Sequence, residues 1–174
     1  MFEKGEYIIY GNLGVCEVGD ITTVNLDGVP RDKLFYVLYP YHQEGKKVFT
    51  PVDNQKTVMR KIITKESAQE LLQEVPMIET IQAANDKLRE EQYKECIRSC
   101  ECRQLVKVIK TFYKQKQQRM AQGKKMPAMD EKYSRMAEDN LYLELSIPLD
   151  ISQGDVKQYF ISLETDSEPL ENKI

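Results

Sequence analysis

A line of basic side chains on one predicted helix is the strongest chemical pattern in this sequence. Four cations recur at intervals of four, three and four residues: Arg103, Lys107, Lys110 and Lys114. On a helix they form a stripe about 60° wide, nearly opposite an apolar face that carries Leu105 and Ile109. Like charges in line repel by a few tenths of a kcal/mol per pair, and a polyanion along the helix would relieve this repulsion. The pattern is equally compatible with a solvated helix face.

The charge along the chain is uneven although the whole chain carries only −3. Residues 103–135 contain ten Lys or Arg and two acids, a net charge of +8, whereas residues 137–174 contain two Lys and nine acids, a net charge of −7. Such a basic block favours contact with nucleic acid, mainly through phosphates. The predicted DNA-binding residues are Lys87, Arg89, Lys110, Lys114, Lys124, Lys125 and Lys132.

The residues that could serve catalysis or metal binding do not form a recognisable site. Cys96, Cys100 and Cys102 follow CxxxC and CxC spacings, which suit zinc poorly, and the one histidine, His42, lies far away in the sequence. We interpret the cysteines as buried structural thiols. The phosphate-loop, dinucleotide and zinc-protease motifs are absent from the sequence. We therefore expect no enzyme, no cofactor, no metal and no small-molecule substrate.

The composition is that of an ordinary soluble protein. Its 174 residues are 41% hydrophobic and 30% charged, which is enough for one sound core or for two small domains. No apolar run approaches the length of a membrane span. The chain starts with acidic residues where a signal peptide has basic ones, so we expect a cytoplasmic location and no membrane partner.

The first third of the chain has the pattern of short strands separated by turns. The predicted strands cover residues 6–10, 15–18 with a continuation over 21–26, 34–39, 48–49 and 57–62. Turn signals such as Gly11-Asn12 and Glu44-Gly45 separate them. Regularly spaced short strands are typical of a small barrel or half-barrel.

The remaining chain is predicted to be helical. Thr64 is a candidate cap for a helix over 65–74, which Pro76 ends. A second helical region runs from about residue 79 to 161, with breaks at Ser99, at residues 123–127 and at residues 148–154. Ser152 and Asp155 resemble a capping box before the last helix. The end of the chain is acidic and is expected to fray.

Residues 2–15 are similar to the pattern F-x-x-G-D-x-V-x-Y-P-x-H-G-V-G, and Val48–Asn54 is similar to the pattern V-P-V-D-N. With these segments the chain resembles the CarD family of bacterial transcription regulators, whose opening has the first pattern and one of whose later strands ends in the second. Residues 86–94 and 137–142 are similar to its helical half. The combination, which is more specific than any one motif, covers about residues 1–163.

The resemblance implies an α+β, two-domain protein that is not an enzyme. An N-terminal Tudor/SH3-like β-barrel over residues 1–62 would bind the RNA polymerase β subunit, as does the same module of the transcription-repair coupling factor. An all-α domain over 63–163 would contact promoter DNA near the upstream edge of the transcription bubble and modulate open-complex stability. Residues 164–174 would form an acidic flexible tail. The alternative is an interaction module that docks through its barrel and does not bind DNA.

Two details refine these expectations. The predicted polymerase contact is an exposed strand edge with Lys46, Lys47, Val48 and Phe49, of which either Val48 or Phe49 must belong to the core by alternation. Many relatives carry a tryptophan wedge near the start of the long helix, and this chain has no tryptophan. The corresponding residues 80–86 contain no aromatic side chain, so a weak or absent wedge is expected.

Overall fold

A computed structural model describes residues 1–164 of the chain. The chain folds as two compact units, Met1–Ile62 and Ile63–Ile174, which we call unit 1 and unit 2. Unit 1 contains the strands and unit 2 contains the long helices, so the α+β fold class is confirmed. The predicted acidic tail, apart from Glu164 at the end of the last helix, lies outside the described residues.

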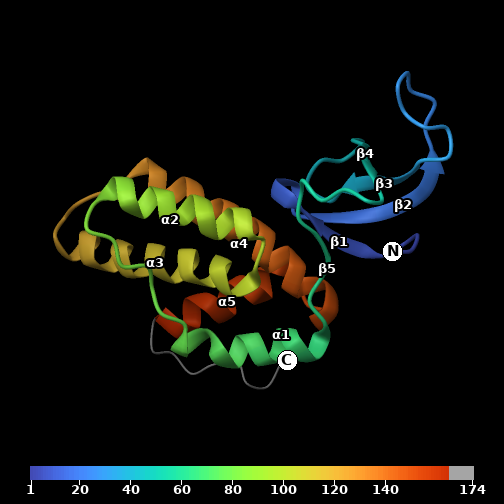
Figure 1. The fold of residues 1–174 in the computed structure, drawn as a ribbon. Coiled ribbons are helices and arrows are strands. Elements are labelled where there is room, and N and C mark those ends of the chain that lie inside the picture. Colours follow the sequence, from blue (N-terminus) through green and yellow to red (C-terminus); the bar gives the residue numbers. More distant parts are fainter. Residues whose placement is uncertain (165–174) are drawn as a thin grey trace. The chain divides into compact units, whose positions relative to one another are not determined.

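Unit 1 is built on a five-stranded antiparallel sheet with a barrel-like topology, as predicted (Figure 1). Its strands run in the spatial order β4-β3-β2-β1-β5. Their bounds are β1 Tyr7–Tyr10, β2 Val15–Thr23, β3 Leu34–Pro40, β4 Val48–Pro51 and β5 Met59–Lys61. A short 3-10 turn, η1 Gly11–Leu13, joins β1 to β2.

Alternation along the strands supplies the core of unit 1. Ile8 of β1 stands opposite Cys16 of β2, and both are fully buried. Tyr36 and Leu38 of β3 fill the same cluster. The N-terminal Phe2 packs on Tyr36 and donates its backbone N–H to the Tyr36 hydroxyl over 2.9 Å. This cluster takes every second residue of the two longest strands, Cys16 and Val18 of β2 and Tyr36 and Leu38 of β3.

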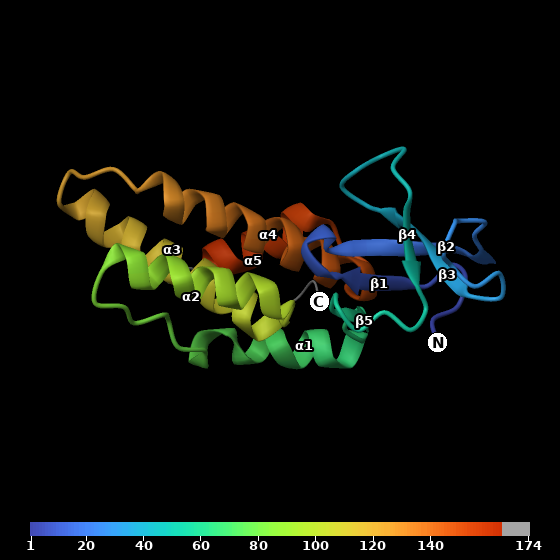
Figure 2. The same ribbon diagram turned by 45° about the horizontal axis from the view of Figure 1, so that its top comes forward.

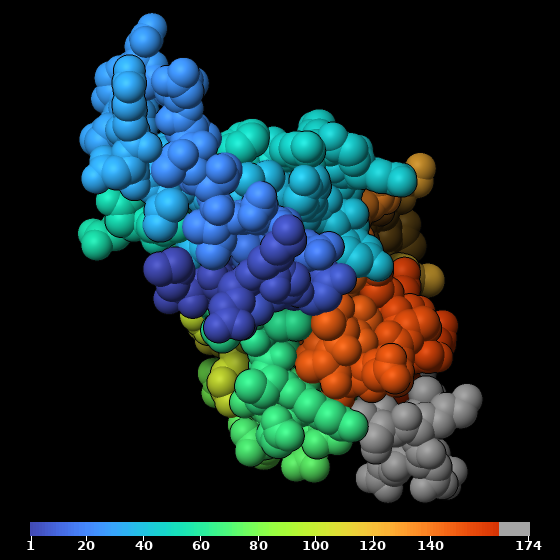
Figure 3. All heavy atoms as spheres, turned by 90° about the vertical axis from the view of Figure 1, so that its right-hand side faces the viewer, coloured from blue at the N-terminus to red at the C-terminus, as the bar shows by residue number. Residues whose placement is uncertain are grey.

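The longest strand, β2, carries an irregularity at Gly19. Val18 pairs with Leu38, but Asp20 pairs with Val37, so Gly19 has no opposite residue on β3. This extra residue is a β-bulge. The predicted continuation of the strand ends at Thr23, and residues 24–33 form an exposed loop that projects beyond the sheet (Figures 1 and 3).

Unit 2 is a helical bundle (Figure 2). Its helices are α1 Lys65–Glu74, α2 Asp86–Ser99, α3 Cys102–Ala121, α4 Ala128–Leu149 and α5 Gln153–Glu164, with a 3-10 turn, η2 Val75–Met77, after α1. Thr64 caps α1 by accepting the Ser67 N–H. The Ser152 hydroxyl accepts the Asp155 N–H and donates to the Asp155 carboxylate, which confirms the predicted capping box.

The second helical region begins later than predicted. Residues 79–85 are not helical, and α2 starts after Asn85, whose side chain accepts the Leu88 N–H over 2.9 Å. The Ile81 N–H donates to the Thr111 hydroxyl of α3 over 2.8 Å, while the Ile81 side chain packs against the core. These tertiary contacts hold the segment in an extended form that local helix propensity alone does not favour.

The core of unit 2 lies between α3, α4 and the helices around them. Val106, Val108 and Ile109 of α3 are fully buried, as are Leu141 and Leu145 of α4. The amphipathic face predicted for α3 is therefore confirmed at its centre.

A buried carboxylate fixes the first residue of unit 2. Glu144 of α4 is 1% exposed, and its Oε1 accepts the Ile63 N–H over 3.0 Å. Ile63 also packs against the helical core. The chain is thus attached to the central helix α4 before α1 begins.

Candidate partner-binding surfaces

The strand β4 is an edge of the sheet in unit 1. It pairs with β3 on one side and has no strand neighbour on the other among the described residues. Val48 packs against the core cluster, whereas Phe49 is 52% exposed. Alternation therefore assigns Val48 to the interior and Phe49 to the surface. Lys46 and Lys47, just before the strand, are exposed, as predicted for a contact surface.

Sequence reasoning missed two residues connected with this edge, Tyr39 of β3 and Gly19 of β2. The Lys47 ammonium lies 5.7 Å from the centre of the Tyr39 ring, within range of a cation–π contact. Tyr39 is 37% exposed although it belongs to a nearly continuous apolar run. Gly19 lies beneath its ring. The available signal was the glycine within a strand pattern, which often marks a bulge or a close backbone approach.

Five of the predicted DNA-binding residues have exposed side chains around one end of the helical bundle. α2 starts, α3 ends and α4 starts at this end (Figures 1 and 2). The contact of Arg89 with Asp130 confirms that the starts of α2 and α4 adjoin. We call this surface the basic end, and it comprises Lys87, Lys124, Lys125 and Lys132, with Lys114 about two turns before the end of α3.

Arg89 does not belong to this surface, which corrects its assignment as a DNA-binding residue. It is 6% exposed, and its Nε and Nη2 atoms donate to the two carboxylate oxygens of Asp130, each over 2.7 Å. Its Nη1 donates to Asp86 over 2.9 Å. The guanidinium is therefore not available to a phosphate, because it is buried and two carboxylates already neutralise and orient it.

The basic stripe on α3 is likewise used partly inside the unit. Arg103 forms two hydrogen bonds with Glu74 at the end of α1, of 2.8 and 2.9 Å. The Lys110 ammonium donates to the carbonyls of Val75, Pro76 and Ile78 over 2.7, 3.2 and 2.5 Å. Helix C-termini expose carbonyls and negative partial charge, which attract cations. Arg103 and Lys110 are thus engaged within unit 2, and we therefore remove Lys110 from the proposed DNA-binding residues.

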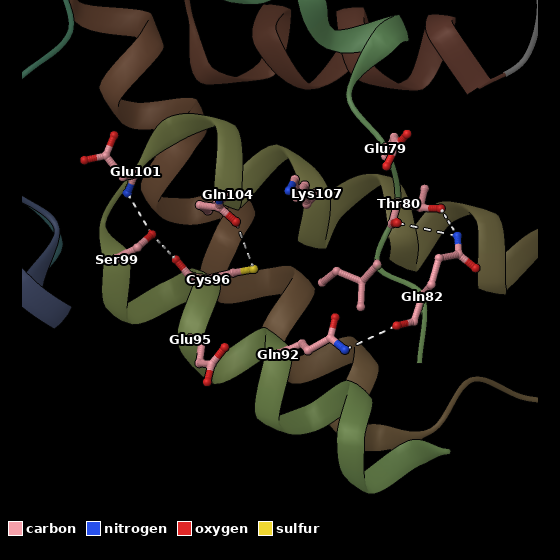
Figure 4. A pocket seen from close by; sticks show the side chains of 11 residues that line it. Glu79, Thr80, Gln82, Gln92, Glu95, Cys96, Ser99, Glu101, Gln104 and Lys107 are labelled. Atoms are coloured by element: carbon pink, nitrogen blue, oxygen red, sulfur yellow. Dashed lines mark hydrogen bonds between the residues drawn. The ribbon is translucent and has the colours of Figure 1, made fainter. Parts of the chain in front are cut away.

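A hollow of about 740 Å³ lies where residues 79–82 pass over α2 and α3 (Figure 4). Three carboxylates line it, Glu79, Glu95 and Glu101, together with Lys107, the second cation of the α3 stripe. Glutamines fill the intervening wall, and Gln92 donates to the Gln82 carbonyl over 3.2 Å. None of the basic-end residues lines this hollow, and its carboxylates disfavour phosphate.

All four cysteines are buried, which confirms this part of their interpretation as buried structural thiols. Burial raises the pKa of the Cys16 thiol to about 12, and burial also raises the pKa of Cys96. Both are therefore protonated, weakly nucleophilic thiols at neutral pH. Within residues 1–164, no group of three or more His, Cys, Asp or Glu residues could hold a metal ion. No described helix is long and apolar enough to cross a bilayer.

These features define unit 1 as a small barrel-like binding domain with an open, partly apolar edge. Residues 2–63 match the family model of the CarD-like/TRCF RID domain. Unit 1 therefore belongs to this family of RNA polymerase-interacting domains, and the resemblance found in the sequence is confirmed for this part of the chain. A search of curated proteins found no significant match to the chain.

Proposed function

We propose that this protein is a bacterial, cytoplasmic transcription regulator that is not an enzyme. Unit 1 binds the β subunit of RNA polymerase through the edge of β4, and unit 2 contacts promoter DNA through the basic end. The two contacts together modulate the stability of the open complex. The family of unit 1 supports the polymerase contact, and the exposed cations of unit 2 support the DNA contact.

The observation that carries the polymerase proposal is the unpaired edge of β4. An open edge offers a row of backbone N–H and C=O groups to which an extended partner segment adds as a further strand. Phe49 adds an exposed apolar side chain. Lys46 and Lys47 favour a partner segment that carries carboxylates. Soluble proteins usually protect such edges from other chains, so an open edge with an exposed aromatic residue suits a docking site.

The polymerase contact is tested by charge reversal. The double variant Lys46→Glu with Lys47→Glu is compared with wild type for retention of RNA polymerase from a bacterial lysate and for affinity to the purified β subunit. We expect weaker binding with an unchanged melting temperature. Lys4→Glu, which changes an exposed lysine outside β4, is the matched control. Unchanged affinity of the double variant would exclude these two lysines from the contact.

The DNA contact is proposed to be weak and directed mainly at phosphates. If four of the five basic-end lysines bind phosphates together, the log–log dependence of affinity on salt has a slope of roughly −3.6. The measurement uses the full chain and a duplex of promoter length. The variant Lys124→Gln with Lys125→Gln should reduce both affinity and slope, while Lys157→Gln, on α5, should change neither.

The second candidate is an interaction module that binds polymerase and no DNA. One specific observation favours it: two cations of the α3 stripe and Arg89 are engaged within unit 2. This leaves fewer charges for DNA than the sequence indicates. DNA affinity that is undetectable even at low salt, together with retained polymerase binding, would select this alternative.

A further inference from the structure

The glycine at the β2 bulge is required by a close approach of another side chain. Its φ is not among the positive values of the chain, so left-handed backbone does not explain it. A Cβ atom at Gly19 would instead lie 1.9 Å from Cε2 and 2.5 Å from Cδ2 of the Tyr39 ring. Real carbon atoms do not approach so closely, so the ring lies directly against the glycine backbone.

Register explains why this ring reaches the bulge. Tyr39 stands opposite Glu17, so its side chain is on the same face of the sheet as that of Glu17. Gly19 is two residues further along β2 and has no partner of its own on β3. The ring therefore covers the backbone that the bulge leaves without a cross-strand neighbour.

The same ring contacts a residue of the proposed polymerase edge. The Lys47 ammonium is 5.7 Å from the centre of the Tyr39 ring. Lys47 directly precedes β4 and is two residues before Phe49. Phe49 stands opposite Val37, two residues before Tyr39 on β3. The exposed phenylalanine thus shares a face of the sheet with the Tyr39 ring, and the lysine ammonium lies over that ring.

We infer that Gly19 and Tyr39 are positioning residues for partner binding at the β4 edge. Because Gly19 has no side chain, the Tyr39 ring can lie against its backbone. In this position the ring holds the Lys47 ammonium beside Phe49. Lysine loses much rotamer freedom when it binds, so a lysine that is already oriented binds with a smaller entropic cost. This inference rests on the proposed role of β4 in polymerase binding, and it assigns part of that role to residues on two other strands.

The test combines affinity for the β subunit with a measurement on the free protein. We expect Gly19→Ala and Tyr39→Leu each to weaken binding about two- to fivefold, the range of an exposed cation–π contact, whereas Tyr39→Phe keeps the ring and binds as wild type does. In a Lys47→Met background, Gly19→Ala should have no further effect. Equal weakening by Gly19→Ala with and without Lys47 would show general damage to the barrel and would overturn the inference.

The free protein distinguishes failure of this inference from failure of the proposed function. In wild type, the Tyr39 ring current should shift the NMR signals of the Lys47 side-chain methylenes, and Gly19→Ala should return them toward ordinary lysine values. If those signals stay shifted in Gly19→Ala, the glycine does not seat the ring and the inference is wrong. If they return but wild type does not bind polymerase, the positioning stands and the proposed function fails. Tyr39→Leu, which leaves the bulge unaltered, supplies the same comparison if Gly19→Ala does not fold.

Discussion

Arg89 of α2 donates two parallel hydrogen bonds, each of 2.7 Å, to the carboxylate of Asp130 on α4. Asp130 is fully buried, and it also accepts a 2.8 Å hydrogen bond from the Tyr93 hydroxyl. The hydrogen bond with Asp130 raises the pKa of Arg89 above its usual value, and burial followed by the Asp130 hydrogen bond raises the pKa of Tyr93. The guanidinium is therefore charged and the phenol neutral across the physiological range, and together they neutralise and solvate the buried carboxylate.

Removal of the Arg89 side chain should destabilise unit 2 strongly. We expect Arg89→Ala to lower the free energy of unfolding by about 3–5 kcal/mol, because Asp130 would become a buried and uncompensated charge. Lys87→Ala, at an exposed position of the same helix, is the matched control and should change the free energy of unfolding by less than about 0.5 kcal/mol. Urea unfolding followed by helix circular dichroism measures both. Equal stability of the two variants would mean that Arg89 carries no structural role.

Lys110 should contribute to stability and not to DNA affinity. Lys110→Met removes the ammonium from three carbonyls after α1, which should cost about 1–3 kcal/mol. Lys114→Met, on the same helix and exposed, should leave stability unchanged but lower DNA affinity. Chemical unfolding and DNA titration of both variants separate the two roles. If Lys110→Met lowered DNA affinity and left stability unchanged, Lys110 would belong to the DNA-binding surface.

The acidic end of the chain should compete with DNA for the basic end. Residues 164–174 contain Glu164, Asp166, Glu168 and Glu171. Their removal should raise DNA affinity at low salt, and the gain should shrink as salt screens the charges. Fluorescence anisotropy at two salt concentrations provides the measurement. Affinity that does not change at low salt would show that no such competition exists.

The ion pair between Glu6, which directly precedes β1, and Lys61 of β5 should be visible in a pH titration. The Glu6 carboxylate accepts a 2.6 Å hydrogen bond from Lys61, which lowers the pKa of Glu6. A lowered carboxyl pKa stabilises the fold above the unfolded value of about 4.3, and this contribution disappears as pH falls through the folded value. NMR titration should show the Glu6 pKa rising toward its ordinary value in Lys61→Met. An unchanged pKa in that variant would assign the shift to other groups.

The missing tryptophan should limit the effect of this protein on the open complex. An aromatic wedge replaces lost base stacking worth a few kcal/mol, and residues 80–86 offer no such ring. Wild type should therefore bind polymerase but lengthen open-complex lifetime less than tryptophan-bearing relatives do. Ala84→Trp should lengthen it further, and Ala84 is a better site than Asp86 because Asp86 pairs with Arg89. A wild-type lifetime equal to that of such a relative would disprove the argument.

Local patterns predicted the elements of this protein well. Turn residues and alternation located the strands, and the Thr64 and Ser152 caps marked two helix starts. The main error, the helical interpretation of residues 79–85, arose because a hydroxyl thirty residues away, that of Thr111, holds the Ile81 backbone. Periodicity within the segment contains no information about that contact.

The candidate sites were harder to predict because charge in a sequence does not reveal its partners. Lys110 and Lys114 have the same residue type on the same helix, yet one binds the end of another segment and the other is exposed. Arg89 and Lys87 differ in the same way. Tyr39 was missed because it belongs to a run of apolar residues, and its position over a glycine backbone depends on strand register.

The attachment of Ile63 to Glu144 has a mechanical consequence. If unit 1 is tethered to polymerase and unit 2 to DNA, tension carried along the backbone enters unit 2 at Ile63, the residue whose N–H is bound by a carboxylate of α4. The load therefore reaches α4, whose apolar residues form much of the core, before it reaches α1. Without the hydrogen bond between Ile63 and Glu144, the same tension would act first on α1 and would detach it from the bundle turn by turn. Glu144→Gln, which keeps an acceptor, and Glu144→Leu, which does not, should differ in the force at which α1 detaches under an optical trap.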